Sequence, residues 1–248
     1  MKIDLTGRRA LVAGGSRGIG LAIARAFAEA GANVAICARQ PAALEAAAQM
    51  LASTGRRVSA RACDLSQADQ VREWVNAAAA DLGGIEILVN NASGFGRTDD
   101  EAGWAASIQI DLMATVRASH AALPYLERQG GSIVHISSTA GLGASVRTPP
   151  YGAVKAALME YTQTQAATLA GKRIRVNCIA PGSIYFEGGT WDMARQHNPA
   201  LYERTLARIP SGRYGTPEEV AHVATFLVSD QASWVTGQTI AVCGGQSL

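Results

Sequence analysis

Charged residues are scarce in this sequence. They make up 17% of its 248 residues, with 22 lysines and arginines against 20 aspartates and glutamates, a net charge of +2. No run of like charges occurs, whereas proteins that bind nucleic acid or a membrane surface concentrate their basic residues. The charge pattern therefore argues against nucleic acid and membranes as partners and favours a small-molecule substrate.

Long apolar runs are also missing. No stretch approaches the ~18 apolar residues that a transmembrane helix needs. Asp4, Thr6 and Gly7 interrupt the amino-terminal segment before an apolar core of signal-peptide length could form. We therefore expect a cytoplasmic protein.

Cysteine is rare as well, with four residues in the chain. They form no Cys-x-x-Cys pair and show no spacing typical of metal ligands. This favours free thiols in a reducing compartment over disulfides, and it predicts no metal site. The four residues are Cys37, Cys63, Cys178 and Cys243.

Apolar segments of strand length alternate with segments of helical periodicity along nearly the whole chain. This alternation predicts an α/β fold, a single Rossmann-like domain over residues 1–248, in which about seven parallel strands form a doubly wound sheet with helices on both faces. Residues 183–215 interrupt the alternation, and we expect them to form a substrate loop or lid. The expected strands cover residues 9–13, 33–38, 57–62, 86–89, 132–136, 174–179 and 239–242; the expected helices cover 18–30, 41–53, 67–82, 102–126, 151–169 and 217–227.

Residues that could take part in binding or catalysis follow the strands at their carboxyl ends. In an open parallel sheet the ligand crevice lies at that edge, so these residues should gather around one ligand. They are Gly14, Arg39, Asp64, Asn90, Ser138 and Pro181.

A glycine-rich turn joins the first strand to the first helix. Its glycines let the backbone turn tightly and let a diphosphate approach the helix N-terminus, where free N–H groups favour an anion. The spacing Gly-x-x-x-Gly-x-Gly in this context predicts a dinucleotide site. The residues that we expect to contact the cofactor here are Gly14, Ser16, Arg17, Gly18, Ile19 and Gly20.

The end of the second strand indicates which dinucleotide is bound. An NAD site usually carries an acidic residue there for the ribose 2′-hydroxyl, but this chain has Arg39 and no acid. A guanidinium stays charged and binds phosphate in a bidentate manner, so Arg39 and Arg17 could hold a 2′-phosphate. We therefore expect NADP(H) rather than NAD(H).

Tyr151 and Lys155 begin the helix after the fifth strand. Their i, i+4 spacing places both on one helix face. A phenol ordinarily titrates near 10 and is a poor acid–base group at neutral pH, unless a nearby cation stabilises its negative charge. Ser138 ends the fifth strand, and its hydroxyl could share a substrate oxygen with Tyr151.

These motifs together resemble the short-chain dehydrogenase/reductases, of the compact kind that includes β-ketoacyl-acyl-carrier-protein reductases. The resemblance covers essentially the whole chain. It implies an NADP(H)-dependent oxidoreductase that interconverts a carbonyl and a secondary alcohol by hydride transfer, with 3-oxoacyl thioester reduction as one candidate, and a homotetramer or homodimer. It depends on Gly14-x-x-x-Gly18-x-Gly20, Asp64, Asn90-Asn91-Ala92, Ser138, Tyr151-x-x-x-Lys155, Pro181-Gly182, Thr236-Gly237 and Gly244-Gly245.

The resemblance also implies residue roles. Tyr151 would protonate the carbonyl oxygen during reduction, Ser138 would orient that carbonyl, and Lys155 would favour the phenolate and bind the nicotinamide ribose. The remaining expected cofactor contacts are Asp64 and Leu65 at the adenine, Asn90 and Ala92 in the cofactor cleft, and Pro181, Gly182 and Ile184 at the nicotinamide carboxamide.

The chain departs from the family pattern at a few positions. Asp111 stands where the family has an asparagine that supports a proton relay; its carboxylate could still accept a bond from water, or it could pair with Lys155. Ser93 replaces a motif glycine, and Cys243 replaces an aspartate near the C-terminus. Phe186 stands near an expected threonine.

The substrate pocket should lie where Ser138 and Tyr151 face the loop, which is rich in apolar and aromatic side chains. Two other functions stay open from the sequence. One is an epimerase or dehydratase that uses the same Tyr–Lys pair on a nucleotide sugar; the other is a sensor or scaffold that binds the nucleotide without turnover. The pocket candidates are Trp104, Tyr185, Phe186, Trp191, Met193, Tyr202 and Leu206.

Overall fold

Seven strands form one sheet in the order β3-β2-β1-β4-β5-β6-β7, and every neighbouring pair runs parallel. The computed structural model describes residues 3–248. The order reverses between β1 and β4, which creates the crevice where such sheets bind ligands. The strands are β1 (Arg9–Ala13), β2 (Asn33–Ala38), β3 (Val58–Ala62), β4 (Ile87–Asn90), β5 (Gly131–Ile136), β6 (Ile174–Pro181) and β7 (Thr239–Val242).

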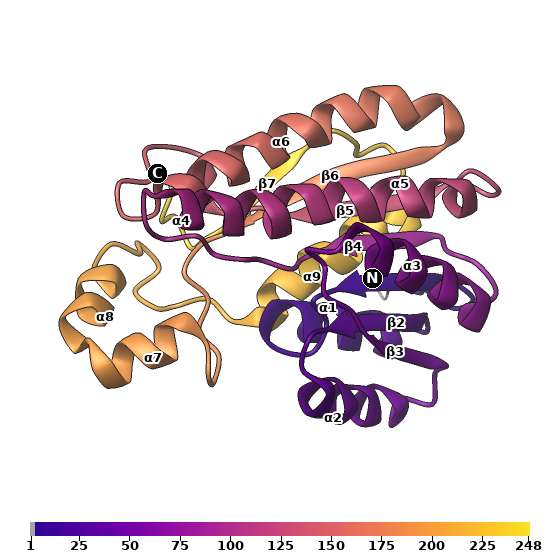
Figure 1. The fold of residues 1–248 in the computed structure, drawn as a ribbon, viewed down its shortest axis with the longest axis horizontal. Helices are drawn as coiled ribbons and strands as arrows, with labels where there is room; N and C mark the ends of the chain where they lie inside the picture. The colour runs from indigo at the N-terminus through magenta and orange to yellow at the C-terminus, as the bar shows by residue number, and fades with distance from the viewer. Residues whose placement is uncertain (1–2) are drawn as a thin grey trace.

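Helices cover both faces of the sheet, so the predicted doubly wound α/β fold is confirmed (Figure 1). On one face lie α1 (Gly18–Glu29), α2 (Pro41–Ala52) and α9 (Pro217–Val228); on the other lie α3 (Ala68–Leu82), α5 (Ala114–Leu126) and α6 (Pro149–Leu169). Short 3-10 turns are η2 (Thr139–Gly141), η3 (Ala170–Lys172) and η4 (Asp230–Ala232).

Two apolar cores sandwich the sheet, because successive residues of a strand point to opposite faces. Val12 of β1 packs with Ile23 and Phe27 of α1. Its neighbour Leu11 packs on the other face with Trp74 of α3. All five apolar side chains are 3% exposed or less, so each face of the sheet is anchored by its own helix layer.

The expected helix over residues 102–126 is present but is not uniform. It consists of α4 (Glu101–Ala106), the π-helical segment η1 (Ser107–Met113) and α5. Apolar periodicity does not distinguish a π-helical turn from an α-helical one, and such turns frequently occur at functional sites. Here η1 carries the buried Asp111.

The expected irregular segment over residues 183–215 contains two helices, α7 (Thr190–His197) and α8 (Pro199–Leu206). Each is only eight residues long, so its apolar pattern spans little more than two turns and is a weak signal in the sequence. Asn198 caps α8 by accepting a bond from the Leu201 N–H at 3.1 Å. Figure 1 shows both helices standing apart from the sheet. Within residues 3–248, no helix has the length and apolar character required to cross a bilayer.

Candidate active site

The strand register brings the predicted site residues to one edge of the sheet. Ala13 pairs with Cys37 on one side and with Asn90 on the other. Ala13, Cys37 and Asn90 therefore lie side by side in the sheet. The residues that follow them lie at the same carboxyl edge, as the sequence predicts.

The glycine-rich turn is shaped for close contact. Gly14 and Gly18 have φ angles of +72° and +53°, a region that favours glycine. A Cβ atom on Gly20 would collide with the carbonyl oxygen of Gly14, which also accepts a bond from Asn91 Nδ2 at 2.9 Å. The strand-4 loop thus holds the glycine turn in place.

The N-terminus of α1 is suited to an anion. Its first turn carries no acidic residue, and the Arg17 side chain does not cap it. The helix dipole and the uncapped N–H groups can therefore bind a diphosphate. Together with the glycine cradle, this arrangement fits a nicotinamide dinucleotide.

The segment after β6 lies over this turn. A Cβ atom added to Gly18 would be 2.6 Å from Phe186 Cζ, so the aromatic ring lies directly on the glycine. Arg17 also reaches this segment, because its guanidinium donates to the Gly188 carbonyl at 3.3 Å. Phe186, which stands near the threonine that the family pattern implies, therefore packs against the predicted diphosphate site.

Arg39 and Asp64 lie beyond β2 and β3. Asp64 accepts bonds from the backbone N–H and the hydroxyl of Ser66 at 3.0 and 2.8 Å. These bonds, and to a lesser extent the charge of Arg39, lower the pKa of Asp64. Asp64 is thus a fixed carboxylate next to an exposed guanidinium, and the adjoining Leu65 is buried.

A buried ion pair lies beneath Tyr151. Lys155 Nζ is 2.9 Å from Asp111 Oδ1 and donates to the Ile136 carbonyl at 2.9 Å. The same ammonium lies 5.4 Å from the centroid of the Tyr151 ring. Burial alone would lower the pKa of Lys155, but the charges of Asp111 and Tyr151 raise it above its usual value. The lysine is therefore a permanent cation beside the phenol.

Two serines connect β5 to α6. Ser137 is buried and donates to the Lys155 carbonyl at 2.6 Å. Ser138 is half-buried, and its Oγ accepts the Ala140 N–H at 3.1 Å. The turn η2 that Ser138 caps packs against α6, since a Cβ atom on Gly141 would be 2.7 Å from the Lys155 carbonyl carbon. Ser138 is thus held beside the helix that carries Tyr151.

Asn90 points into the core rather than into open space. Its Nδ2 lies 3.2 Å from both Ser119 Oγ and His135 Nδ1. His135 continues the chain to Gln165 at 2.9 Å, and Gln165 donates to the Tyr161 hydroxyl at 2.8 Å. Burial lowers the pKa of His135 to about 4, so the imidazole is neutral. Asn90 is thus held at the end of β4 by a buried polar network.

The segment over residues 183–215 has its own internal packing. Asp192 accepts bonds from the Tyr185 hydroxyl at 2.8 Å and the Gly188 N–H at 2.9 Å. Tyr202 and Trp191 pack on Tyr214, with ring centroids 4.6 and 5.3 Å apart. Several of the predicted pocket aromatics therefore form the small core of this segment.

The base of that segment is tied to the sheet. Ile184 pairs with Gly215 in an isolated parallel bridge, and the Gly182 N–H donates to the Val242 carbonyl at 2.9 Å. Gly182 contacts Cys243, because a Cβ atom there would be 2.7 Å from Cys243 Cβ. Pro181, Gly182 and Ile184 thus form a fixed stem at the carboxyl end of β6.

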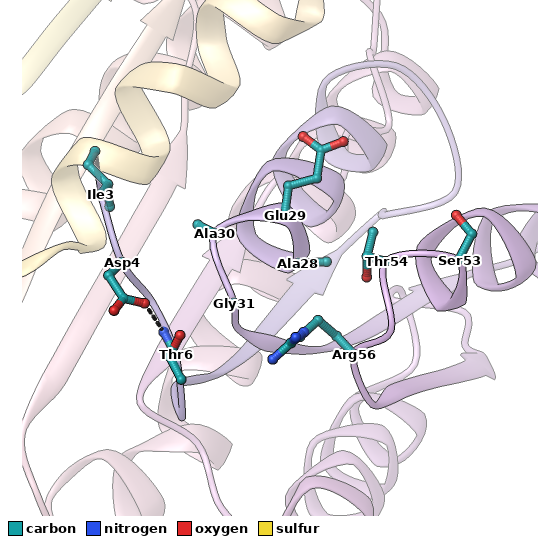
Figure 2. Close-up of a pocket in the computed structure, with 10 residues that line it drawn as sticks. All are labelled: Ile3, Asp4, Thr6, Ala28, Glu29, Ala30, Gly31, Ser53, Thr54 and Arg56. Carbon is teal, nitrogen blue, oxygen red and sulfur yellow. Dashed lines mark hydrogen bonds between the residues drawn. The ribbon is translucent and has the colours of Figure 1, made fainter. Parts of the chain in front are cut away.

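An open depression of about 770 Å³ lies away from these residues (Figure 2). It adjoins the amino ends of β1, β2 and β3 and contains none of the predicted site residues. It is lined by Ile3, Asp4, Thr6, Ala28, Glu29, Ala30, Gly31, Ser53, Thr54 and Arg56.

Sequence reasoning did not identify Phe95 as a neighbour of the site. Its ring packs edge-to-face on Tyr151, with centroids 4.9 Å apart and planes at 88°. The available signal was the Gly94-Phe95-Gly96 triplet, which Ser93 separates from the Asn-Asn-Ala motif, because glycines flanking an aromatic residue allow a tightly packed loop.

Known proteins resemble the chain over nearly all of its length. Residues 13–247 match the family model described as Enoyl-(Acyl carrier protein) reductase. A 3-oxoacyl-[acyl-carrier-protein] reductase of Chlamydia trachomatis is 39% identical, with 98% of each chain covered.

Solved structures are similar as well. L-sorbose reductase from Gluconobacter frateurii, complexed with NADPH and L-sorbose, has a TM-score of 0.92 at 32% identity, over 100% of this chain and 99% of that one. A 7α-hydroxysteroid dehydrogenase, complexed with NADH and 7-oxo glycochenodeoxycholic acid, has a TM-score of 0.92 at 31% identity, over 98% and 96% of the two chains.

Proposed function

The chain belongs to the short-chain dehydrogenase/reductase family and is a nicotinamide-dependent oxidoreductase of carbonyls and alcohols, and from this premise we propose that it is an NADP(H)-dependent reductase of 3-oxoacyl thioesters or similar 3-oxo compounds. The observation that carries the proposal is the buried Lys155 ammonium beside the Tyr151 ring. Similarity to 3-oxoacyl-[acyl-carrier-protein] reductase supports the substrate class.

We assign the acid–base role to Tyr151. When bound, the reduced nicotinamide supplies a hydride to the carbonyl carbon. The Tyr151 hydroxyl donates a proton to the carbonyl oxygen, and the Lys155 cation stabilises the negative charge that this transfer leaves on the phenol oxygen. The Ser138 hydroxyl donates a hydrogen bond to the same carbonyl oxygen and orients it. Asp111 is assigned as a positioning residue, since it contacts Lys155.

We assign the cofactor site to the glycine turn and the loops beside it. The turn and the N-terminus of α1 would hold the diphosphate, with Ser16 and Ile19 lining it. Arg39 and Arg17 would bind the 2′-phosphate, Asp64 and Leu65 would contact the adenine, and Ala92 would line the cleft. The stem after β6 would contact the carboxamide.

We further propose that the chain acts as one domain whose residues 183–215 close over the substrate, and that it assembles into a homotetramer or homodimer in the cytoplasm. The internal packing of this segment around Tyr214 and its tied stem support movement as a unit.

The test is the Tyr151→Phe variant. The change removes one hydroxyl that donates a proton in the transition state, so we expect kcat to fall by about 10²–10⁴-fold. NADPH affinity, measured by fluorescence titration, should stay within a few-fold of the wild-type value. A panel of 3-oxo thioesters, 3-oxo esters, cyclic ketones, quinones and sugars, followed by NADPH absorbance, gives the activities.

Two results would contradict the proposal. Turnover by Tyr151→Phe at the wild-type rate would remove the acid assignment. Turnover of sugars or quinones with none of the 3-oxo compounds would remove the substrate class and leave the oxidoreductase assignment in place.

A further inference from the structure

The loop that follows β4 has an unusual backbone at Phe95. Its φ angle is +48°, and within residues 3–248 only one other non-glycine residue, Arg173, has a positive φ. A bulky side chain in this region is strained, and such conformations persist only where the surroundings enforce them. They cluster at functional sites, so the contacts that hold Phe95 are informative.

Three consecutive N–H groups of this loop are bound to side-chain oxygens. The Gly94 N–H donates to Asp111 Oδ2 at 3.0 Å, the Phe95 N–H to Ser93 Oγ at 3.1 Å, and the Gly96 N–H to Ser107 Oγ at 3.1 Å. Both Asp111 and Ser107 belong to η1 and are fully buried. The π-helical segment therefore fixes the backbone on both sides of Phe95.

Glycine is required on both sides of Phe95. A Cβ atom at Gly94 would collide with the carbonyl oxygen of Ala106, and one at Gly96 would collide with that of Gly103. The loop is thus pressed against α4 with no room for side chains at these two positions. Between these two glycines, the loop places the Phe95 ring against Tyr151.

Phe95 lies between the phenol and a cation. Its ring meets Tyr151 at a centroid distance of 4.9 Å, and Arg97 Cζ stacks over it at 5.2 Å. Phe95 is half-buried and Arg97 is exposed. Asp111 contacts both Lys155 and the Gly94 N–H. A single carboxylate therefore positions the cation beside Tyr151 and also positions the loop that packs on Tyr151.

We propose that Phe95 is a specificity-determining residue that forms the wall of the substrate site beside Tyr151. A carbonyl oxygen that accepts a proton from Tyr151 must bring its substituents within reach of this ring. The ring fills the space on its side of the phenol, so it accepts a slim, unbranched apolar substituent and excludes one branched next to the carbonyl. The substrate class is therefore unbranched 3-oxo compounds. This inference depends on the proposed function, since it assumes that Tyr151 contacts the carbonyl.

The experiment compares Phe95→Ala with Phe95→Leu, which keeps an apolar side chain of intermediate size. The probes are ethyl 3-oxobutanoate and ethyl 4,4-dimethyl-3-oxopentanoate, which carry a methyl and a tert-butyl group on the same ketone. We expect the wild type to prefer the methyl ketone. Phe95→Ala should shift the ratio of the two kcat/KM values by about tenfold or more toward the tert-butyl ketone, the range that one or two methyl groups give in apolar pockets. Phe95→Leu should shift it less.

NADPH affinity and thermal unfolding show whether the variants keep the fold and the cofactor site. If alanine destabilises the loop, Phe95→Gly removes the ring and also relieves the positive φ, and the same shift is expected. A ratio unchanged in the folded variants, while the wild type stays active, overturns the assignment of Phe95 alone. A wild type inactive on every carbonyl of the panel overturns both this assignment and the proposed function.

Discussion

Asp111 and Lys155 form an ion pair with 2.9 Å between Oδ1 and Nζ, and their side chains are 0% and 2% exposed. The pair links η1 to α6 inside the candidate site. Asp111 also accepts the Gly94 N–H, so the carboxylate has both a charged and a neutral partner. Removing one member of a buried ion pair leaves the charge of the other uncompensated in an environment with little water.

The Asp111→Asn variant should therefore be less stable. An asparagine can still accept the Gly94 N–H but leaves Lys155 without its counter-charge, and breaking a buried pair typically costs about 3–5 kcal/mol. The pKa of Lys155 is raised, so the stabilisation is fully present at neutral pH and is lost only as the pH rises through that raised pKa. Urea unfolding at pH 7 and at pH 8 should show that the free energy of unfolding of the variant lies below that of the wild type by the same amount at both pH values. Equal stability of variant and wild type would show that the pair contributes nothing.

The same variant should keep its catalytic activity. Without the carboxylate, the positive charge of Lys155 acts on Tyr151 uncompensated, which favours the phenolate. We expect kcat to be unchanged or slightly raised. Initial rates of carbonyl reduction at saturating NADPH, measured at pH 7, give this kcat. Total loss of turnover in a folded variant would instead indicate a direct role for the carboxylate.

The sequence predicted the fold and the position of the motifs because both depend on local patterns. Strand and helix periodicities located the seven strands, and the rule that ligands bind at the carboxyl ends of parallel strands placed Gly14 and Asn90 at one edge. The tight turn at Gly14 and the family motifs followed from residue type and spacing alone.

The sequence could not predict contacts between segments distant in the chain. The π-helical turn carries Asp111, whose side chain accepts the Gly94 N–H, and no periodicity encodes this contact. Phe95 reaches Tyr151 only because the loop packs on α4. The residue types left the pairing of Asp111 with Lys155 open as one possibility, and the structure shows this pair.

Replacement of Arg39 should reveal the cofactor preference. The exposed guanidinium follows β2 beside the glycine turn, where a 2′-phosphate would lie. A charge-assisted hydrogen bond is worth about 1.5–3 kcal/mol, so Arg39→Ala should weaken NADPH binding by about 10- to 100-fold and leave NADH binding nearly unchanged. Fluorescence titration gives both affinities. Arg56→Ala, an exposed arginine at the amino ends of the strands, is the control. Equal weakening for both cofactors would assign Arg39 to another part of the dinucleotide.

His135 should make the protein sensitive to mild acid. Burial, helped by the charge of Lys155 and opposed by the bond to Gln165, lowers the pKa of His135 to about 4, whereas an unfolded histidine titrates near 6.5. Between these values the unfolded chain binds a proton that the folded chain does not. The contribution of His135 to the free energy of unfolding should therefore fall as the pH drops from about 6.5 to about 4, by on the order of 3 kcal/mol, and stay constant below that range. Urea unfolding at pH 7, 5.5 and 4.5 measures the slope. His135→Asn should lose this part of the pH dependence, while His120→Asn, at an exposed position, should keep it. An identical slope in wild type and His135→Asn would mean that the buried imidazole is not the group that responds to acid.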